Sequence, residues 1–165
     1  SENVDKSVFS RQFVKETTVD TDLALLIPDT YVANLTERLL LYRELDNITK
    51  AEDLIVFETN LRDRFGPVPT EAIELINVVR MRWAAMPLGF EKITLKNNKM
   101  LCYFLSKQDS EYYNSPMFKA AMLFAQKNPN RSTLKEINNK LWLTVDYVKS
   151  VDEAIVVLGK INELV

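Results

Sequence analysis

NLRDRFGPVPTEAIELINVVRMRWAAMPLGFEKI, residues 60–93, is the stretch that decides the fold. One helix is expected to end at Gly66, because glycine is the usual residue just past a helix C-terminus and prolines follow it closely. A long amphipathic helix is predicted from about Pro69 to Met86, and the turn at Gly89 leads out of it. Apolar residues recur along this helix at steps of four, three, four and three: Ala72, Ile76, Val79, Trp83 and Met86. This helix is therefore predicted to be the spine of the core, with Trp83 buried.

Length and composition indicate one domain. The chain has 165 residues, of which 47% are hydrophobic and 27% charged, so it can bury a core without disulfides. Residues 1–10 are polar and are expected to be a flexible segment, whereas residues 11–165 are expected to form a single α+β domain. The net charge is −2, and each third of the chain is close to neutral.

The first half of the chain predicts a strand and three helices. Residues 13–26 favour a strand, which Pro28 ends. Asn34 with Glu37, and Thr49 with Glu52, have the spacing of capping boxes at two helix starts. The expected inward-facing residues of these two helices are Leu35, Leu39, Tyr42 and Leu45 in the first, and Leu54, Leu61 and Phe65 in the second.

The second half predicts two hairpins and two helices. Asn97-Asn98 and Asn138-Asn139 each separate two strand-like segments, and asparagine tolerates the positive φ that a two-residue hairpin turn needs. Ser115-Pro116 and Ser150 with Glu153 are typical helix starts. Because the strands come in antiparallel pairs, we expect an α+β fold: an antiparallel sheet built from two Asn-Asn hairpins plus an N-terminal strand, packed against about five helices.

The residues that the chain lacks exclude most catalytic machinery. It has no histidine, one cysteine (Cys102) and three glycines. A Ser-His-Asp triad, a Cys/His zinc site and a glycine-rich phosphate loop therefore cannot be built, and we expect no catalytic, cofactor-binding or metal-binding residues. A lone thiol suits a reducing compartment, and no segment has the length of a membrane span or the pattern of a signal peptide. A cytoplasmic protein without membrane contact is expected.

Carboxylate chemistry remains formally open. Acidic residues occur in pairs in turns or first helical turns, where acids usually cap helices and favour the positive end of the dipole: Asp20/Asp22, Glu52/Asp53, Glu71/Glu74 and Asp152/Glu153. Capping is the preferred interpretation of these pairs.

The aromatic residues also allow two interpretations. A base-stacking platform needs a basic groove around it, and near-neutral charge in every third of the chain argues against one. A place in the core is therefore the preferred interpretation of Trp83, Trp142, Tyr103, Phe104, Tyr112 and Tyr113.

Four arginines lie on either side of the first proline–glycine turn: Arg62, Arg64, Arg80 and Arg82. Arg62 and Arg64 flank Asp63 immediately before the turn. Such a mixed-charge triplet suits an exposed protein contact, and an ordinary solvated helix face is the alternative. Arg62, Asp63 and Arg64 are the candidate protein-interface residues.

Several segments in order resemble the C-terminal domain of the bacterial transcription-repair coupling factor (Mfd) family. They are LIPDTYV at residues 26–32, RLLLYREL at 38–45, LRDRFGPVP at 61–69 and LGFEKI at 88–93. Relatives often carry two acids on the helix that ends in D-R-F-G. This chain keeps Asp63 and has Asn60 one turn earlier.

The resemblance implies a regulatory part of a larger protein. Members of the family are ATP-driven DNA translocases that displace stalled RNA polymerase at lesions and recruit UvrA. Their motor motifs lie upstream of this domain, and UvrA and RNA polymerase act through other parts. The resemblance implies that this domain is non-catalytic, packs on the N-terminal UvrB-like module of the same protein, masks its UvrA-binding surface, and touches no nucleic acid directly.

Two other function classes stay open. An autonomous nucleic-acid-binding module is the alternative, and the salt dependence of any DNA binding would test it. A carboxylate-based hydrolase is the second, and a broad hydrolase substrate screen would test that.

Overall fold

The computed structural model describes residues 12–165, so the expected flexible segment at residues 1–10 lies outside the described part. The chain divides into two compact units. The first, here called the sheet unit, contains residues up to Leu23 together with Met81–Val165. The second, the helical unit, is Ala24–Arg80. No helix within residues 12–165 is both long and apolar enough to cross a membrane.

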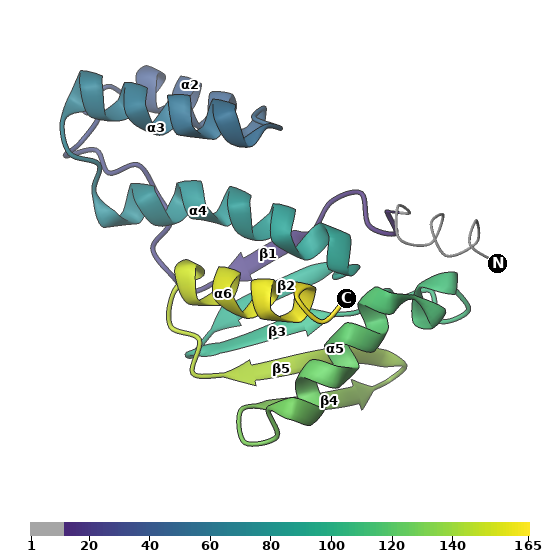
Figure 1. Ribbon diagram of the computed structural model, residues 1–165. Coiled ribbons are helices and arrows are strands. Elements are labelled where there is room, and N and C mark those ends of the chain that lie inside the picture. Colours follow the sequence, from purple (N-terminus) through teal and green to yellow (C-terminus); the bar gives the residue numbers. More distant parts are fainter. Residues whose placement is uncertain (1–11) are drawn as a thin grey trace. The chain divides into compact units, whose positions relative to one another are not determined.

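The sheet unit is built on five strands in the order β1-β2-β3-β5-β4 (Figure 1). The strands are β1 (Thr18–Thr21), β2 (Lys92–Lys96), β3 (Lys99–Tyr103), β4 (Ser132–Ile137) and β5 (Lys140–Asp146). Every pairing is antiparallel except that of β1 with β2, which is parallel. The predicted α+β class, with two hairpins and an N-terminal strand, is confirmed.

Both hairpin turns form where paired asparagines predicted them. Asn97 and Asn98 have φ of 53° and 60°, and Asn138 and Asn139 have φ of 51° and 64°. Asparagine enters this left-handed region more readily than other residues with a β-carbon. Because both turn residues have positive φ, the turn twist matches that of the flanking strands.

Two helices cover one face of this sheet: α5 (Pro116–Lys127) and α6 (Val151–Asn162) (Figure 1). The expected starts are confirmed, since the side chains of Ser115 and Ser150 accept hydrogen bonds from the amides of Phe118 and Glu153. Alternate strand residues pack beneath the helices and are buried: Ile93, Leu95, Met100, Cys102, Leu143 and Val145. Short 3-10 helices, η1 (Met86–Leu88) and η2 (Glu111–Asn114), complete the unit.

The N-terminal strand is much shorter than the predicted segment of residues 13–26. β1 has four residues, and its register with β2 ends at Thr21 opposite Leu95. Just beyond, the Asp22 carboxylate accepts a hydrogen bond from the amide of Asn97, which already lies in the hairpin turn. The length of β1 is therefore limited by the length of its partner strand. The strand propensities of residues 13–26 do not reveal this limit.

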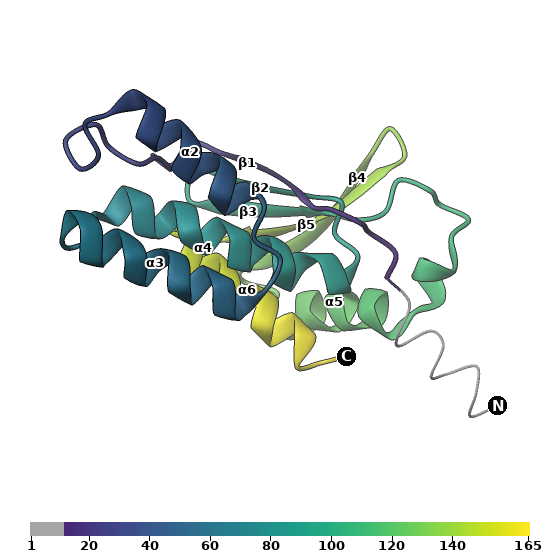
Figure 2. The same ribbon diagram turned by 90° about the horizontal axis from the view of Figure 1, so that it is seen from above.

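The helical unit contains α2 (Leu35–Asp46), α3 (Ala51–Phe65) and most of α4 (Thr70–Ala85) (Figure 2). The side chain of Asn34 caps α2 as predicted, accepting from the amide of Glu37 at 2.9 Å. The second capping box was wrong, because α3 begins at Ala51 with Lys50 as its N-cap and no side-chain cap. Thr49 therefore lies one position too early to cap the helix.

The predicted inward face of α2 is confirmed for Leu45, Tyr42 is half-buried, and the prediction was wrong for Leu35 and Leu39. Leu35 and Leu39 are exposed, whereas Leu41 and Leu45 are buried. Three consecutive leucines at residues 39–41 point in different directions, so spacing alone does not say which one is buried. In α3 the interior expectation is confirmed for Leu54 and Leu61, and Phe57 joins them, while Phe65 is half-buried.

The spine helix α4 has the predicted bounds, but Trp83 is not fully buried. Ala72, Ile76 and Val79 are buried as expected, and Trp83 and Met86 are half-buried. Met81 and Ala85 are fully buried instead. They lie on a second stripe at steps of three, four and three, formed by Val78, Met81, Ala85 and Leu88. Toward the end of α4, this second stripe faces the core in place of the predicted one.

Candidate protein-interaction surface

The predicted interface triplet occupies the last turn of α3. Arg62, Asp63 and Arg64 are all exposed. The helix ends at Gly66, whose φ of 88° favours glycine and whose amide donates to the carbonyl oxygen of Arg62 at 2.9 Å. The backbone beside the triplet is therefore held by a defined helix end.

Tyr31 braces this helix end from a distant part of the sequence. Its hydroxyl lies 2.7 Å from the carbonyl oxygen of Gly66 and 3.0 Å from that of Leu61, and it donates its proton to these acceptors. Its ring lies 5.7 Å from that of Phe65. Burial raises the pKa of Tyr31, and the charge of Arg62 acts in the opposite direction. The LIPDTYV and DRFGP segments of the sequence therefore form one substructure.

Two of the three charges have partners inside the helical unit. Arg64 pairs with the carboxylate of Glu37 on α2, and its guanidinium carbon lies 4.7 Å from the Phe65 ring centre. Arg62 lies 3.9 Å from Glu58. Within residues 12–165, Asp63 has no ion pair or side-chain hydrogen bond. Asp63 is therefore the charge of the triplet that is free to meet a partner.

The other two arginines lie on α4. Arg80 lies ten residues beyond the start of α4, about 15 Å along its axis at 1.5 Å per residue, and its guanidinium donates to the side-chain oxygen of Asn77 at 2.8 Å. Arg82 is half-buried in the sheet unit. Within the helical unit, Arg80 is therefore separated from the triplet along α4, and Arg82 belongs to the other unit.

Exposed apolar side chains near the triplet were missed by sequence reasoning. Ile55 and Val56 on α3 are 58% and 54% exposed. They precede Arg62 and Asp63 by seven residues, a spacing that places residues on the same helix face. Leu35, Leu39 and Leu40 on α2 are exposed as well. We call Ile55, Val56, Arg62, Asp63 and Arg64 the α3 surface. The spacing of apolar residues alone gave no signal that Ile55 and Val56 face outward.

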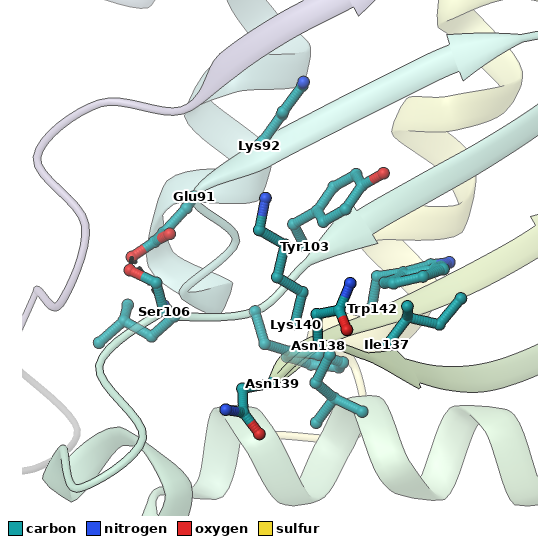
Figure 3. Close-up of a pocket in the computed structure, with 12 residues that line it drawn as sticks. Glu91, Lys92, Tyr103, Ser106, Ile137, Asn138, Asn139, Lys140 and Trp142 are labelled. Carbon is teal, nitrogen blue, oxygen red and sulfur yellow. Dashed lines mark hydrogen bonds between the residues drawn. The ribbon is translucent and has the colours of Figure 1, made fainter.

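The expectation that the aromatic residues belong to the core is confirmed only in part. Phe104 and Tyr112 are buried. Tyr103 and Trp142 instead line a hollow of about 590 Å³ in the sheet unit, together with Glu91, Lys92, Ser106 and residues 137–141 (Figure 3). Their ring centres are 5.5 Å apart with an angle of 35° between the planes. The sequence could not separate the buried aromatic residues from those that line the hollow, because strand residues alternate between the two faces of the sheet and the alternation does not say which face is covered.

Several of the paired acids have structural partners. Asp20 accepts from Lys96 at 2.9 Å, and that hydrogen bond lowers the pKa of Asp20. The Glu153 carboxylate accepts from the amide of Lys149 at 2.6 Å, next to the start of α6. The Glu153 contact agrees with the helix-capping interpretation, whereas that interpretation was wrong for Asp20, which lies within strand β1 and pairs with a lysine on the neighbouring strand.

Comparison with known proteins gives consistent matches. The model of the TRCF domain family matches residues 21–115. The transcription-repair-coupling factor of Rickettsia conorii is 28% identical over 154 residues, which cover 93% of this chain and 13% of that protein. The factor of Staphylococcus aureus strain USA300 is 25% identical over 148 residues, covering 86% of this chain and 13% of the relative.

A solved structure has the same fold. It is described as the crystal structure of the C-terminal domain of transcription-repair coupling factor, with a TM-score of 0.70, 14% identity, and coverage of 90% of this chain and 94% of that chain. The chain spans only about one eighth of the length of the curated relatives named above. Because the family model covers more than half of the chain, the chain belongs to the TRCF domain family, the C-terminal domain of transcription-repair coupling factors.

Proposed function

We propose that this chain is a non-catalytic regulatory domain of a transcription-repair coupling factor, and that the α3 surface packs on the N-terminal UvrB-like module of the same protein. In this proposal the parent protein is an ATP-driven DNA translocase that displaces stalled RNA polymerase at lesions. Docking masks the module's UvrA-binding surface until RNA polymerase is engaged. Residues 11–165 act as one domain in this role.

The observation that carries the proposal is the environment of Asp63. It is an exposed carboxylate without an ion-pair partner in the described chain, and it lies on a helix end held by Tyr31 and Gly66. A charge on a fixed corner loses little conformational entropy when it docks. A basic residue on the partner module would pair with it.

The apolar part of the same face supports protein contact rather than solvent exposure alone. Ile55 and Val56 are more than half exposed on the side of α3 that carries Arg62 and Asp63. Protein interfaces commonly combine an apolar centre with a polar rim. Two aliphatic side chains beside a charged triplet have this composition.

Asp63→Ala and Val56→Ser in the full-length factor test the proposal. Both should raise basal ATPase activity and UvrA binding, because each removes a docking contact, and neither should lower the melting temperature. The loss of a partly desolvated charge pair at an interface costs about 2–5 kcal/mol, whereas a rim pair mainly changes the association rate.

Two matched variants serve as controls. Asp109→Ala removes an exposed acid from the sheet unit, and Val156→Ser changes a valine on α6 that is 55% exposed, close to the 54% of Val56. Both controls should leave ATPase activity and UvrA binding unchanged. If Asp63→Ala lowers the melting temperature instead, its role is local. If all variants behave like the parent protein, docking uses another face.

A further inference from the structure

The face of the sheet opposite α5 and α6 carries an ordered row of aromatic and basic side chains. Register places Lys92 on β2 opposite Tyr103 on β3, Tyr103 opposite Trp142 on β5, and Trp142 opposite Lys135 on β4. Directly opposed residues share one face of a sheet. Ile93, Cys102 and Leu143 alternate with this row and are buried on the other face. Two rings therefore lie side by side with a lysine on each flank.

The rings are accessible and their surroundings are hollowed. Tyr103 and Trp142 are each only partly buried and line the hollow of about 590 Å³. Figure 3 shows Tyr103, Lys140 and Trp142 gathered on one side of the strands. The Lys92 ammonium lies 5.7 Å from the Tyr103 ring centre. Flat rings at a hollow can accept another flat group on their faces.

The charges around the rings are predominantly positive. Within the described chain, Lys92, Lys135 and Lys140 form no ion pairs. Further along the face, Lys96 and Lys99 are partly neutralised by Asp20 at 2.9 Å and Asp146 at 3.8 Å. The acid in the hollow is Glu91, whose carboxylate accepts from the amide and hydroxyl of Ser106 at 3.0 and 3.1 Å. Three lysines thus remain available for an anion.

We propose that this face, formed by Lys92, Tyr103, Lys135, Lys140 and Trp142, binds single-stranded nucleic acid. Bases stack on the rings of Tyr103 and Trp142, and the three lysines contact the phosphates on either side. Single strands are the occupant that fits both features, because an unpaired base presents its flat surface and the backbone supplies regularly spaced negative charge. In a duplex the flat surfaces of the bases are stacked inside the helix, so only the lysines would make contacts, to its phosphates.

This inference is independent of the proposed docking role. The α3 surface belongs to the helical unit, whereas the aromatic row belongs to the sheet unit. Variants of one surface leave the other intact, so either proposal can fail without the other.

Fluorescence anisotropy with the 165-residue chain tests the proposal. The probes are labelled fifteen-nucleotide oligo(dT), oligo(rU) and a duplex of equal length, at about 50 mM salt. Both single strands should bind more tightly than the duplex, and comparison of the two separates DNA from RNA preference. Trp142→Leu and Tyr103→Leu should each weaken binding roughly 5- to 150-fold, the usual effect of losing one stacked base.

The salt dependence of binding tests the contribution of the three lysines separately. With three phosphate contacts, log affinity should fall against log salt with a slope of about −2 for a single strand. Each of Lys92→Gln, Lys135→Gln and Lys140→Gln should reduce that slope by about 0.7. Lys160→Gln, an exposed lysine on α6, is the matched control and should leave the slope unchanged.

A second measurement covers the case in which a ring variant does not fold. In a Trp83→Phe chain, Trp142 is the remaining tryptophan, and oligo(dT) or oligo(rU) should quench its fluorescence to saturation. Absence of binding by both single strands, or unchanged affinity in a folded Trp142→Leu chain, would overturn the proposal. Equal affinity for the duplex with no quenching would show a non-specific charge contact only, and would overturn it as well.

Discussion

The ring of Tyr112 lies against the backbone of Gly89, so that a β-carbon on residue 89 would stand 2.1 Å from Cε2 of that ring. The Tyr112 hydroxyl donates to the carbonyl oxygen of Leu88 at 2.8 Å, and the side chain is buried. Gly89 also has φ of 81°, in the left-handed region. The L-G turn that leaves α4 is therefore closed by a tyrosine from η2, and glycine is required there by both backbone conformation and space.

Gly89→Ala should destabilise the chain by about 2 kcal/mol or more, because the left-handed conformation alone costs a residue with a β-carbon about 1–3 kcal/mol and the ring must also move. Gly159→Ala is the matched control. Gly159 lies within α6 and nothing surrounds its added β-carbon within 4 Å. That change should stabilise by about 0.5–1 kcal/mol. Urea unfolding of both variants measures the difference, and equal effects would contradict the explanation.

Tyr31→Phe should cost about 1 kcal/mol, because it removes a hydroxyl that serves the carbonyls of Gly66 and Leu61 while keeping the ring contact with Phe65. Tyr147→Phe is the control, since that ring is 70% exposed. Thermal melting of the two variants provides the test. A Tyr31→Phe chain as stable as the Tyr147→Phe chain would mean that the hydroxyl does not hold the end of α3.

Stability should fall in alkaline solution. Burial raises the pKa of the Cys102 thiol and, together with the neighbouring Tyr113 and Cys102, that of the Tyr112 hydroxyl. In the unfolded chain the thiol has a pKa of about 8.5 and the tyrosine hydroxyl a pKa of about 10. The folded state keeps its protons while the unfolded state releases them, so stability is complete below about pH 8.5 and declines above it.

Melting temperatures between about pH 7 and 10.5 measure this decline. Cys102→Ala should flatten the part between about pH 8.5 and 10. A thiol reagent should also label Cys102 in the native protein only as fast as the chain unfolds. The reactive form is the thiolate, and the buried thiol keeps its proton in the folded state. Rapid labelling of the native chain near neutral pH would show that the thiol is accessible.

Asn98→Val should destabilise by about 1–3 kcal/mol, because Asn98 has φ of 60° and β-branched residues strongly disfavour that region. Asn98→Gly should be neutral or stabilising, since glycine is preferred in such turns. Thr94→Val, on β2 of the same hairpin, serves as the control and should have little effect. Denaturant unfolding compares the three. Equal stability of the Val and Gly variants at residue 98 would rule out positive φ as the cause.

Local chemistry explains why much of the fold could be predicted. The Asn-Asn pairs, Ser115 and Asn34 each act on backbone groups within a few residues of themselves. The helix breaks at Gly66 and Gly89 likewise depend on φ at a single residue. The candidate residue Asp63 could be named for the same reason, because it stands next to a recognisable helix end.

Other features depend on partners that are distant in sequence. The end of β1 is determined by the length of β2, more than seventy residues later. Which leucine of residues 39–41 is buried depends on what packs against α2, and periodicity fits more than one choice. The ion-pair partners of Arg62 and Arg64 likewise follow from the folded arrangement of α2 and α3, and this arrangement leaves Asp63 unpaired within the described residues.

The sequence by itself determined the turns, the helix ends and the α+β class, because these follow from the φ preferences and hydrogen bonds of neighbouring residues. Only the tertiary structure decided the row from Lys92 through Tyr103 and Trp142 to Lys135. Charge averaged over each third of the chain is near neutral, because acids elsewhere in the sequence offset these lysines. Strand register selects one residue from each of four strands, and this selection concentrates lysines around two rings on one face.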